Sequence, residues 1–166
     1  MASWDPSDRS PLAVDLRLAR HGFVSVFGEA ALASTRSWLL DHGYHVVSID
    51  ASGWQTPAAM HDSLASALGF PDYYGRSLDA FNDCLSELAA GGHGWPASRT
   101  GLVVELQNYD SYAARAADQA NALIEIIHRQ AIHAALYGHR LLCLVGTSDP
   151  TFGLAPVGTA FIVWAS

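Results

Sequence analysis

Apolar and polar positions follow two different patterns along the chain. Short runs of β-branched and aliphatic residues, typical of strands, occur at 22–28, 44–50, 102–106, 140–146 and 159–166. Longer segments with apolar positions three and four residues apart, typical of helices, occur at 29–43, 56–69, 77–88 and 108–139. Because strands and helices alternate, we predict an α/β layered domain with a parallel sheet and helices packed on it.

Capping residues mark several helix ends. Thr56 and Ser77 suit the N-cap position, Pro57 suits the first helical position, and Gly43 suits a C-cap. The apolar side of the helix at 29–43 is expected to consist of Leu32, Leu39 and Leu40. The segment at 108–139 predicts one long helix or two joined helices.

The ends of the chain extend this pattern. Residues 1 to about 14 are polar, contain two prolines and are expected to form a loose lead-in to a single domain spanning 15–166. The strand–helix–strand order over 22–50 predicts a parallel pair of strands joined by a right-handed crossover. The last apolar run is predicted to be a strand at an edge of the sheet.

The helix at 77–88 separates its apolar and acidic residues most clearly. At 100° per residue, one arc holds Leu78, Phe81, Cys84, Leu85 and Leu88. Asp79, Asp83 and Glu87 occupy the opposite arc one turn apart, and Asn82 flanks them. We therefore expect three carboxylates to form a ridge that points away from the core.

This ridge has two interpretations. An outward helix face is ordinarily charged, and Asp79 in the first turn also suits the helix dipole. However, like charges at i, i+4 repel one another, and this helix has no arginine to compensate them. Arg76, just before the helix, is expected to offset only Asp79. Unpaired acids that follow the adjacent Tyr73 and Tyr74 favour a recognition surface instead.

The composition limits the classes of partner that the protein is expected to bind. The 166 residues are 50% apolar and carry a formal charge of −7, and every basic residue is an arginine. Nucleic-acid binding is therefore not expected, because it depends on basic patches, whereas an acidic surface attracts basic partners. Two cysteines are too few for a disulfide framework, no signal peptide is visible, and the apolar runs are too short to span a bilayer. We expect a cytoplasmic protein.

Histidines, a cysteine and a glutamate are further candidates for chemistry. His128, His133 and His139 are five and six residues apart, a poor spacing for one helix face, so we expect no metal site. Cys84 points toward the core and is not expected to be a nucleophile. Glu105, at the end of an apolar run, suits either a functional strand end or a cap for the next loop. Dinucleotide and phosphate-loop motifs are absent, and we expect no cofactor.

The stretch FPDYYGRSLDAFNDCL, residues 70–85, resembles the signature of the barstar-like inhibitors of secreted microbial ribonucleases. The similarity extends more weakly over about residues 44–146. This resemblance implies a three-strand barstar-like core, here enlarged by a strand–helix unit at the N-terminus and a strand at the C-terminus. It also implies a cytoplasmic inhibitor with no catalytic residues.

The resemblance also implies residue roles. Tyr73 would stack on the catalytic groups of a ribonuclease, while Tyr74, Gly75 and Ser77 would belong to the loop that packs on the enzyme. Asp79 and Asp83 would bind the basic residues that normally hold an RNA phosphate, since a cluster of arginines accepts carboxylate and phosphate in the same forked geometry.

Three departures from the family pattern concern partner choice. Asn82 stands where the family has a tryptophan, and Ser77 stands where it has an asparagine. The later helix offers His128, Arg129 and His133 in place of a glutamate. Glu87 is outside the pattern and is expected to restore the lost negative charge.

We therefore predict a 1:1 inhibitor of a basic ribonuclease that plugs the active site with the partner-binding residues Tyr73, Tyr74, Gly75, Ser77, Asp79, Asn82, Asp83 and Glu87. The first alternative is a barstar-like immunity or regulatory protein that neutralises a different basic toxin or partner. The second is a small hydrolase that uses Cys84 or a histidine.

Overall fold

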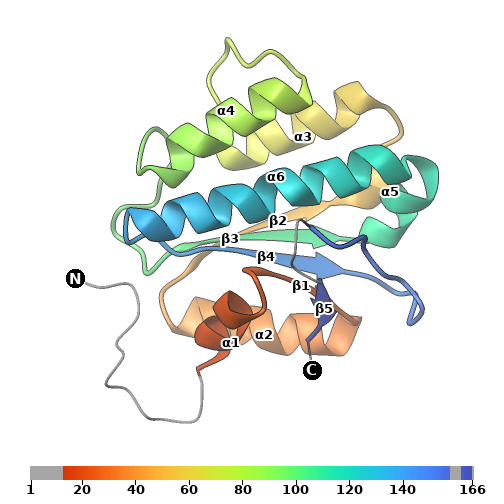
Figure 1. The fold of residues 1–166 in the computed structure, drawn as a ribbon, viewed down its shortest axis with the longest axis horizontal. Helices are drawn as coiled ribbons and strands as arrows, with labels where there is room; N and C mark the ends of the chain where they lie inside the picture. The colour runs from red at the N-terminus through yellow and green to blue at the C-terminus, as the bar shows by residue number, and fades with distance from the viewer. Residues whose placement is uncertain (1–12, 158–161, 166) are drawn as a thin grey trace.

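The computed structural model describes residues 13–157 and 162–165. In this part of the chain five strands form one sheet in the order β2-β3-β4-β1-β5, and all neighbouring pairs are parallel (Figure 1). The strands are β1 (Val24–Phe27), β2 (His45–Asp50), β3 (Leu102–Gln107), β4 (Leu141–Gly146) and β5 (Val163–Trp164). The predicted parallel α/β architecture is confirmed.

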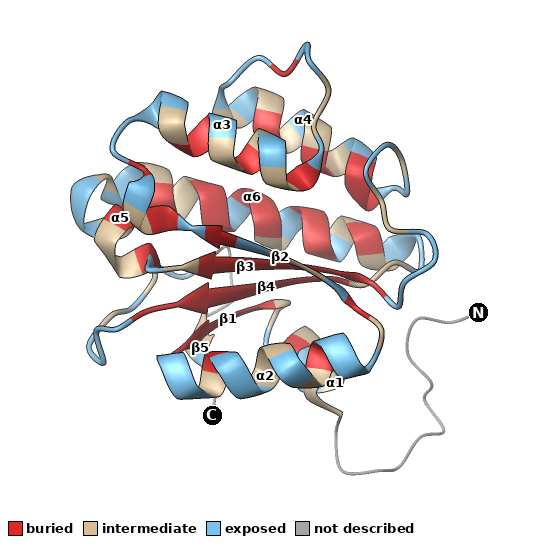
Figure 2. Ribbon diagram, turned by 180° about the vertical axis from the view of Figure 1, so that it is seen from behind, coloured by how far each residue is buried: buried red, intermediate tan, exposed pale blue. Residues whose placement is uncertain are grey.

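Helices cover both faces of this sheet. The helices are α1 (Val14–Arg20), α2 (Glu29–Asp41), α3 (Pro57–Leu68), α4 (Leu78–Ala89), α5 (Tyr109–Arg115) and α6 (Ala117–Leu136), and a short 3₁₀ turn, η1 (Ala51–Gly53), follows β2. Figures 1 and 2 show α1 and α2 on one face and the other helices on the opposite face, with α4 packed against α6.

The central strands connect two apolar cores. All six residues of β4 are buried, because helices cover the sheet on both sides. Leu141, Cys143 and Val145 face the core under α3–α6, whereas Leu142 and Leu144 face a second core that includes Leu18 of α1 and Leu32 of α2. The alternation follows the two-residue period of a strand. Figure 2 shows this buried centre between the two layers of helices.

The structure confirms some of the local predictions and contradicts others. The N-caps at Thr56 and Ser77 are confirmed, and the segment at 108–139 forms two helices divided at Ala116, whose φ of −145° is not helical. β1 and β2 were expected to pair, which is wrong, because β3 and β4 lie between them. Leu40 is 51% exposed rather than part of the apolar side of α2, since it is rotated by about 100° from the buried Leu39.

The N-terminal helix α1 was not predicted from the sequence. The buried carboxylate of Asp15 accepts a hydrogen bond from the Tyr44 hydroxyl at 2.7 Å and lies 3.4 Å from Nη1 of Arg140. Burial and the neighbouring Asp15 raise the pKa of Tyr44 well above its usual value, so it stays neutral and donates. These long-range contacts attach α1 to the sheet. The expected loose lead-in falls largely on residues 1–12, which lie outside the described residues.

The C-terminal strand lies where it was expected. β5 pairs with β1 at the sheet edge through Ser25 opposite Val163 and Val26 opposite Trp164. The remainder of the predicted strand, 159–161 and 166, lies outside the described residues. Among the helices that the structure describes, none has the length and apolar character needed to cross a membrane.

Candidate partner-binding site

The loop between α3 and α4 sends its two tyrosines in different directions. Gly69 ends α3 in the left-handed conformation with φ of 66°, and the backbone then turns so that the Tyr74 amide donates to the Pro71 carbonyl at 2.9 Å. Tyr73 is 77% exposed, whereas Tyr74 is only 7% exposed. The loop therefore presents one aromatic ring to solvent and uses the other as an anchor.

Tyr74 is held on α3. Its ring packs against Phe70, with centroids 5.1 Å apart, and its hydroxyl hydrogen-bonds to Nδ1 of the buried His61. Burial lowers the pKa of His61 and raises that of Tyr74, so both are neutral near pH 7. We expected Tyr74 on the partner-binding surface, but its side chain is covered by these contacts and supports the loop from beneath.

The end of the loop is fixed by an ion pair. Arg76, in the left-handed region with φ of 49°, places its Nε 2.6 Å from the carboxylate of Asp62 on α3. The expectation that Arg76 would offset Asp79 is wrong, because this guanidinium points to α3 instead. Gly75 and Ser77 are exposed on either side of it, where they were expected.

Ser77 starts α4 and orients its acids. The Ser77 Oγ accepts a hydrogen bond from the Ala80 amide at 3.1 Å, which satisfies one free donor of the first turn. Phe81, Leu85 and Leu88 of α4 are fully buried against the core. Capping and burial together fix the rotation of the helix.

Three carboxylates consequently face solvent. Asp79, Asp83 and Glu87, which we call the acidic ridge, are all exposed, as the helical period predicted. Among the described residues none of the three forms an ion pair. The ridge therefore concentrates three negative charges on one helix, which follows the loop that exposes Tyr73.

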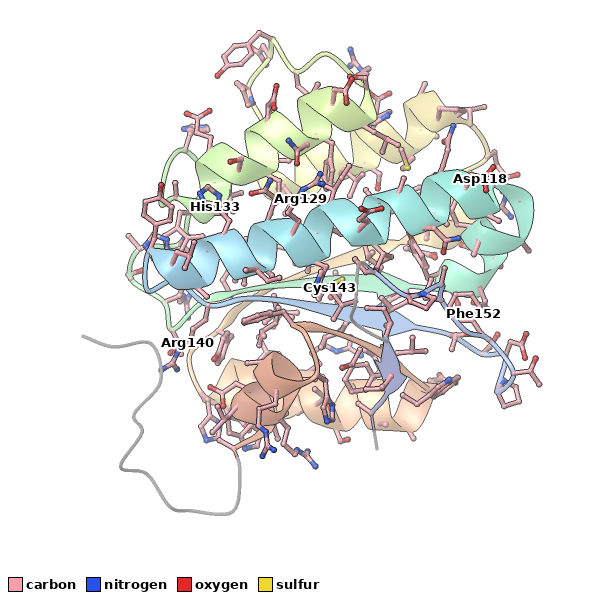
Figure 3. The ribbon with its side chains drawn as sticks, in the orientation of Figure 1. Asp118, Arg129, His133, Arg140, Cys143 and Phe152 are labelled. Atoms are coloured by element: carbon pink, nitrogen blue, oxygen red, sulfur yellow. The ribbon has the colours of Figure 1, made fainter. Side chains whose placement is uncertain are left out.

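Asn82 does not point outward with the ridge. Its Oδ1 accepts hydrogen bonds from Nη2 of Arg129 at 3.1 Å and from Nε2 of Gln130 at 2.9 Å, both on α6. Its own amide nitrogen lies 3.4 Å from Oδ1 of Asp83. Asn82, expected to contact the partner directly, thus joins α4 to α6. The sequence placed both Asn82 and Arg129 among the departures from the family pattern, but it did not predict that the two side chains bond to each other. Figure 3 shows Arg129 on the side of α6 that faces α4.

Comparison with known proteins identifies the family. The sequence model described as Barstar (barnase inhibitor) matches residues 44–146, which include the loop, the ridge, Asn82 and Arg129. The chain belongs to the barstar family. The Bacillus subtilis (strain 168) protein named "Putative ribonuclease inhibitor YrdF" is 35% identical over 81 residues, covering 49% of this chain and 79% of that protein.

The fold also occurs outside the barstar family. The Aeropyrum pernix ORC2 protein, solved as ADPNP–ADP complexes, superposes with a TM-score of 0.52 at 15% identity. The match covers 82% of this chain and 38% of that one. Since the identity is low and this barstar-family chain lacks a phosphate-loop motif, the likeness concerns the fold alone.

The other candidate groups of this barstar-family chain have structural contacts. His128 donates from Nδ1 to the Gly22 carbonyl at 2.7 Å, and His139 donates in the same way to the Ala89 carbonyl at 2.8 Å. His133 Nδ1 lies 3.4 Å from Oγ of Ser86 on α4. Within the described residues no group of three potential ligands could hold a metal ion.

Cys84 has the wrong environment for a nucleophile. Partial burial raises the pKa of its thiol, and the nearby carboxylates of Glu87 and Asp83 raise it further. The reactive thiolate is therefore scarce near pH 7. This observation argues against the version of the hydrolase alternative that uses Cys84 as the nucleophile.

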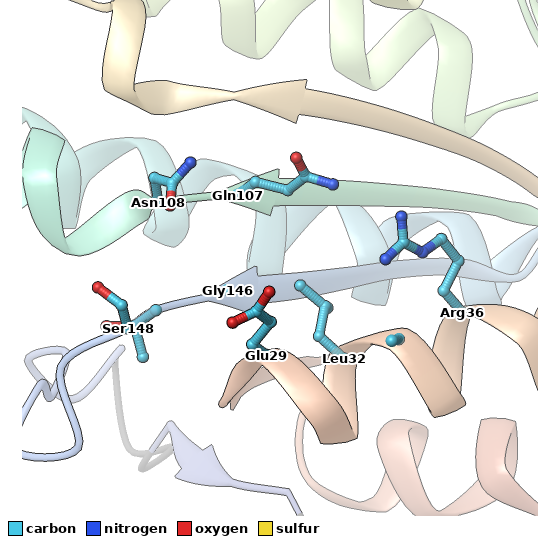
Figure 4. A pocket seen from close by; sticks show the side chains of 9 residues that line it. Glu29, Leu32, Arg36, Gln107, Asn108, Gly146 and Ser148 are labelled. Atoms are coloured by element: carbon cyan, nitrogen blue, oxygen red, sulfur yellow. The ribbon is translucent and has the colours of Figure 1, made fainter.

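An open pocket of about 320 Å³ lies on the side of the sheet that α2 covers, at the carboxyl ends of β3 and β4 (Figure 4). Its lining includes Glu29 and Arg36 of α2 together with Gln107. Glu105 was expected at a strand end, but it lies within β3, is fully buried, and pairs through Oε2 with Nε of Arg36 at 3.3 Å. Arg36, one of the charged residues that line this pocket, is thus already paired with a carboxylate inside the protein.

Proposed function

We propose that this protein binds a basic ribonuclease in a 1:1 complex and inhibits it by covering the active site with the acidic ridge and Tyr73. The observation that carries the proposal is the exposed, unpaired ridge of Asp79, Asp83 and Glu87, in a chain of the barstar family. The protein acts by occupying the cleft and catalyses no reaction.

Phosphate mimicry explains how such a ridge would inhibit. A ribonuclease holds its substrate with cationic side chains, and a carboxylate offers the same acceptor geometry to an arginine fork as a phosphate does. In the free inhibitor the acids repel one another at i, i+4 spacing. Cations of the partner would relieve this repulsion, so complex formation compensates a cost built into the free helix.

Preorganisation and charge support the same proposal. The Ser77 cap and the buried face of α4 fix the ridge before binding, which reduces the ordering cost of association. The formal charge of −7 would accelerate the approach of a basic partner. The two free cysteines are compatible with action in the reducing cytoplasm, where we place the inhibitor.

A titration of ribonuclease activity tests this function. Barnase, the enzyme named in the family description, is held at micromolar concentration with an RNA substrate while the inhibitor is added. We expect cleavage to fall linearly and reach its minimum at one equivalent. Full cleavage with excess inhibitor would contradict the proposal.

One observation favours a second candidate function. Arg129 adds a positive charge at the border of the ridge, and Asn82 is engaged with α6. These features suit a barstar-like protein that neutralises a basic toxin other than a barnase-type ribonuclease. In that case barnase would remain active in the titration, while another basic toxin would be neutralised in a manner that depends on Asp83.

A further inference from the structure

The exposed side of α6 next to α4, which we call its outer side, carries a positive charge close to the negatively charged acidic ridge. Arg129 is exposed, and Nη2 donates one hydrogen bond to Asn82 on α4. A guanidinium has five N–H donors, and among the described residues no carboxylate pairs with this one. Arg129 is therefore positioned by α4 while it keeps donors and charge available to a partner.

The position of Arg129 is defined independently of its own hydrogen bond. Gln130, which is buried, donates to the same oxygen of Asn82 at 2.9 Å, and His133 approaches Ser86 one turn further along both helices. Figure 3 shows Arg129 and His133 on the side of α6 that faces α4. The relative placement of the ridge and Arg129 is thus fixed by contacts between the two helices.

An apolar stripe continues from Arg129 along α6. Ile132 and Leu136 follow at i+3 and i+7 and are 45% and 81% exposed, and the adjoining Tyr137 is 55% exposed. Large apolar side chains that cluster on a surface commonly mark an interaction site. The stripe lies close to α4, because Tyr137 packs against His133 with ring centroids 5.1 Å apart and His133 reaches Ser86 on α4.

Resting on the proposed function, we propose that Arg129 is a specificity-determining residue and that the ribonuclease docks across both α4 and the outer side of α6. Charge complementarity defines the occupant: a basic cleft opposite the ridge, bordered by a carboxylate opposite Arg129 and an apolar side chain opposite Leu136. A ribonuclease with a cation at that border would be disfavoured by repulsion, which is how a charged rim separates related partners.

A charge-swap experiment with barnase as the probe tests the charged part. Each arginine and lysine around the barnase active site is changed singly to glutamate, and binding to the full-length parent, Arg129→Ala and Arg129→Glu is measured directly by calorimetry. We expect at least one barnase variant to bind the parent about fivefold tighter or more. This gain should disappear with Arg129→Ala and reverse with Arg129→Glu. Arg20→Glu, on the opposite face, is the matched control and should retain the gain.

The outcomes separate this inference from the proposed function. If Asp83→Ala loses binding while no barnase variant responds to residue 129, the role of Arg129 is overturned and ribonuclease inhibition stands. If the parent does not bind barnase, both are overturned. Thermal unfolding of the Arg129 variants should match the parent, because Gln130 still holds Asn82.

A pair of leucine variants tests the apolar part. Leu136→Asp should weaken binding to barnase at least about fivefold, whereas Leu40→Asp, an exposed leucine near the end of α2 on the other face, should bind like the parent. Equal binding by both variants would remove α6 from the docking surface.

Discussion

Among single residues, Asp83 has the strongest claim to a binding role. It lies in the middle of the acidic ridge, with Asp79 and Glu87 one turn away on either side. Its contribution to binding can be separated from any contribution to folding, because it is exposed and repelled by both neighbours.

Asp83→Ala should weaken ribonuclease binding at least about 30-fold, the size of effect that defines an interface hot spot. Its free energy of unfolding should be unchanged or slightly higher, since like-charge repulsion is removed. Asp41→Ala on α2 removes one exposed negative charge on the opposite face and serves as the control. Calorimetric binding and urea unfolding of the two variants check this. Equal affinities would place the binding surface elsewhere.

The adjacent tyrosines should respond in opposite ways. Tyr73→Ala removes an exposed ring, so it should weaken binding and leave unfolding unchanged. Tyr74→Phe removes the hydroxyl that meets buried His61, so it should lower the free energy of unfolding by about 1 kcal/mol with little change in affinity. Urea unfolding and ribonuclease titration distinguish them. A loss of affinity confined to Tyr74→Phe would reverse these two roles.

At the scale of elements, α3 acts as the base for the loop that exposes Tyr73. It holds the loop at two points: His61 against Tyr74, and Asp62 against Arg76. His61 is neutral in the folded protein because burial lowers its pKa, although Asp62 opposes this effect and Arg76 adds to it. Attachment of the loop is therefore sensitive to pH.

The free energy of unfolding should fall as pH drops below about 6.5, the usual pKa of histidine. In that range the unfolded chain binds a proton at residue 61 that the folded protein resists, so protonation favours unfolding. Above this range the contribution is constant. Urea unfolding from pH 7.5 to 5 compares the parent with His61→Gln, which stays neutral throughout. Parallel profiles for the two proteins would refute the role of His61.

The elements differ in how far the sequence determines them. The acidic ridge could be predicted because α4 has a clear helical period and a serine cap, which are both local signals. The opposite orientations of Tyr73 and Tyr74 could not, since they depend on His61 thirteen residues earlier. Arg129 meets Asn82 only because α6 packs on α4, although the two residues are 47 positions apart. Asp15 of α1 likewise contacts Tyr44 and Arg140, which lie far along the chain. Local sequence patterns predict helices and strands, whereas contacts between distant segments decide which side chains remain exposed to a partner.

At the scale of the whole molecule, the region matched to the barstar family supplies only part of the sheet that the structure describes. Residues 44–146 supply β2, β3 and β4, while β1 from outside this region pairs with β4 and β5 extends the edge. The second core joins Val103, Leu142 and Leu144 of the matched region to Leu32 and Leu39 of α2. The strand–helix unit that precedes the matched region is thus part of the structural support for the ridge.

Removal of residues 1–43 should therefore abolish cooperative folding, even though the complete family match is retained. The truncated chain would expose the paired edge of β4 and the apolar face now covered by α2, and a hydrophobic unpaired edge promotes aggregation. Near-UV circular dichroism, dye binding and urea unfolding should show lost tertiary packing with exposed apolar surface. A chain starting at residue 13 keeps every described strand and should unfold cooperatively. If the chain starting at residue 44 also unfolds cooperatively and binds ribonuclease like the parent, the N-terminal unit is not needed to hold the ridge.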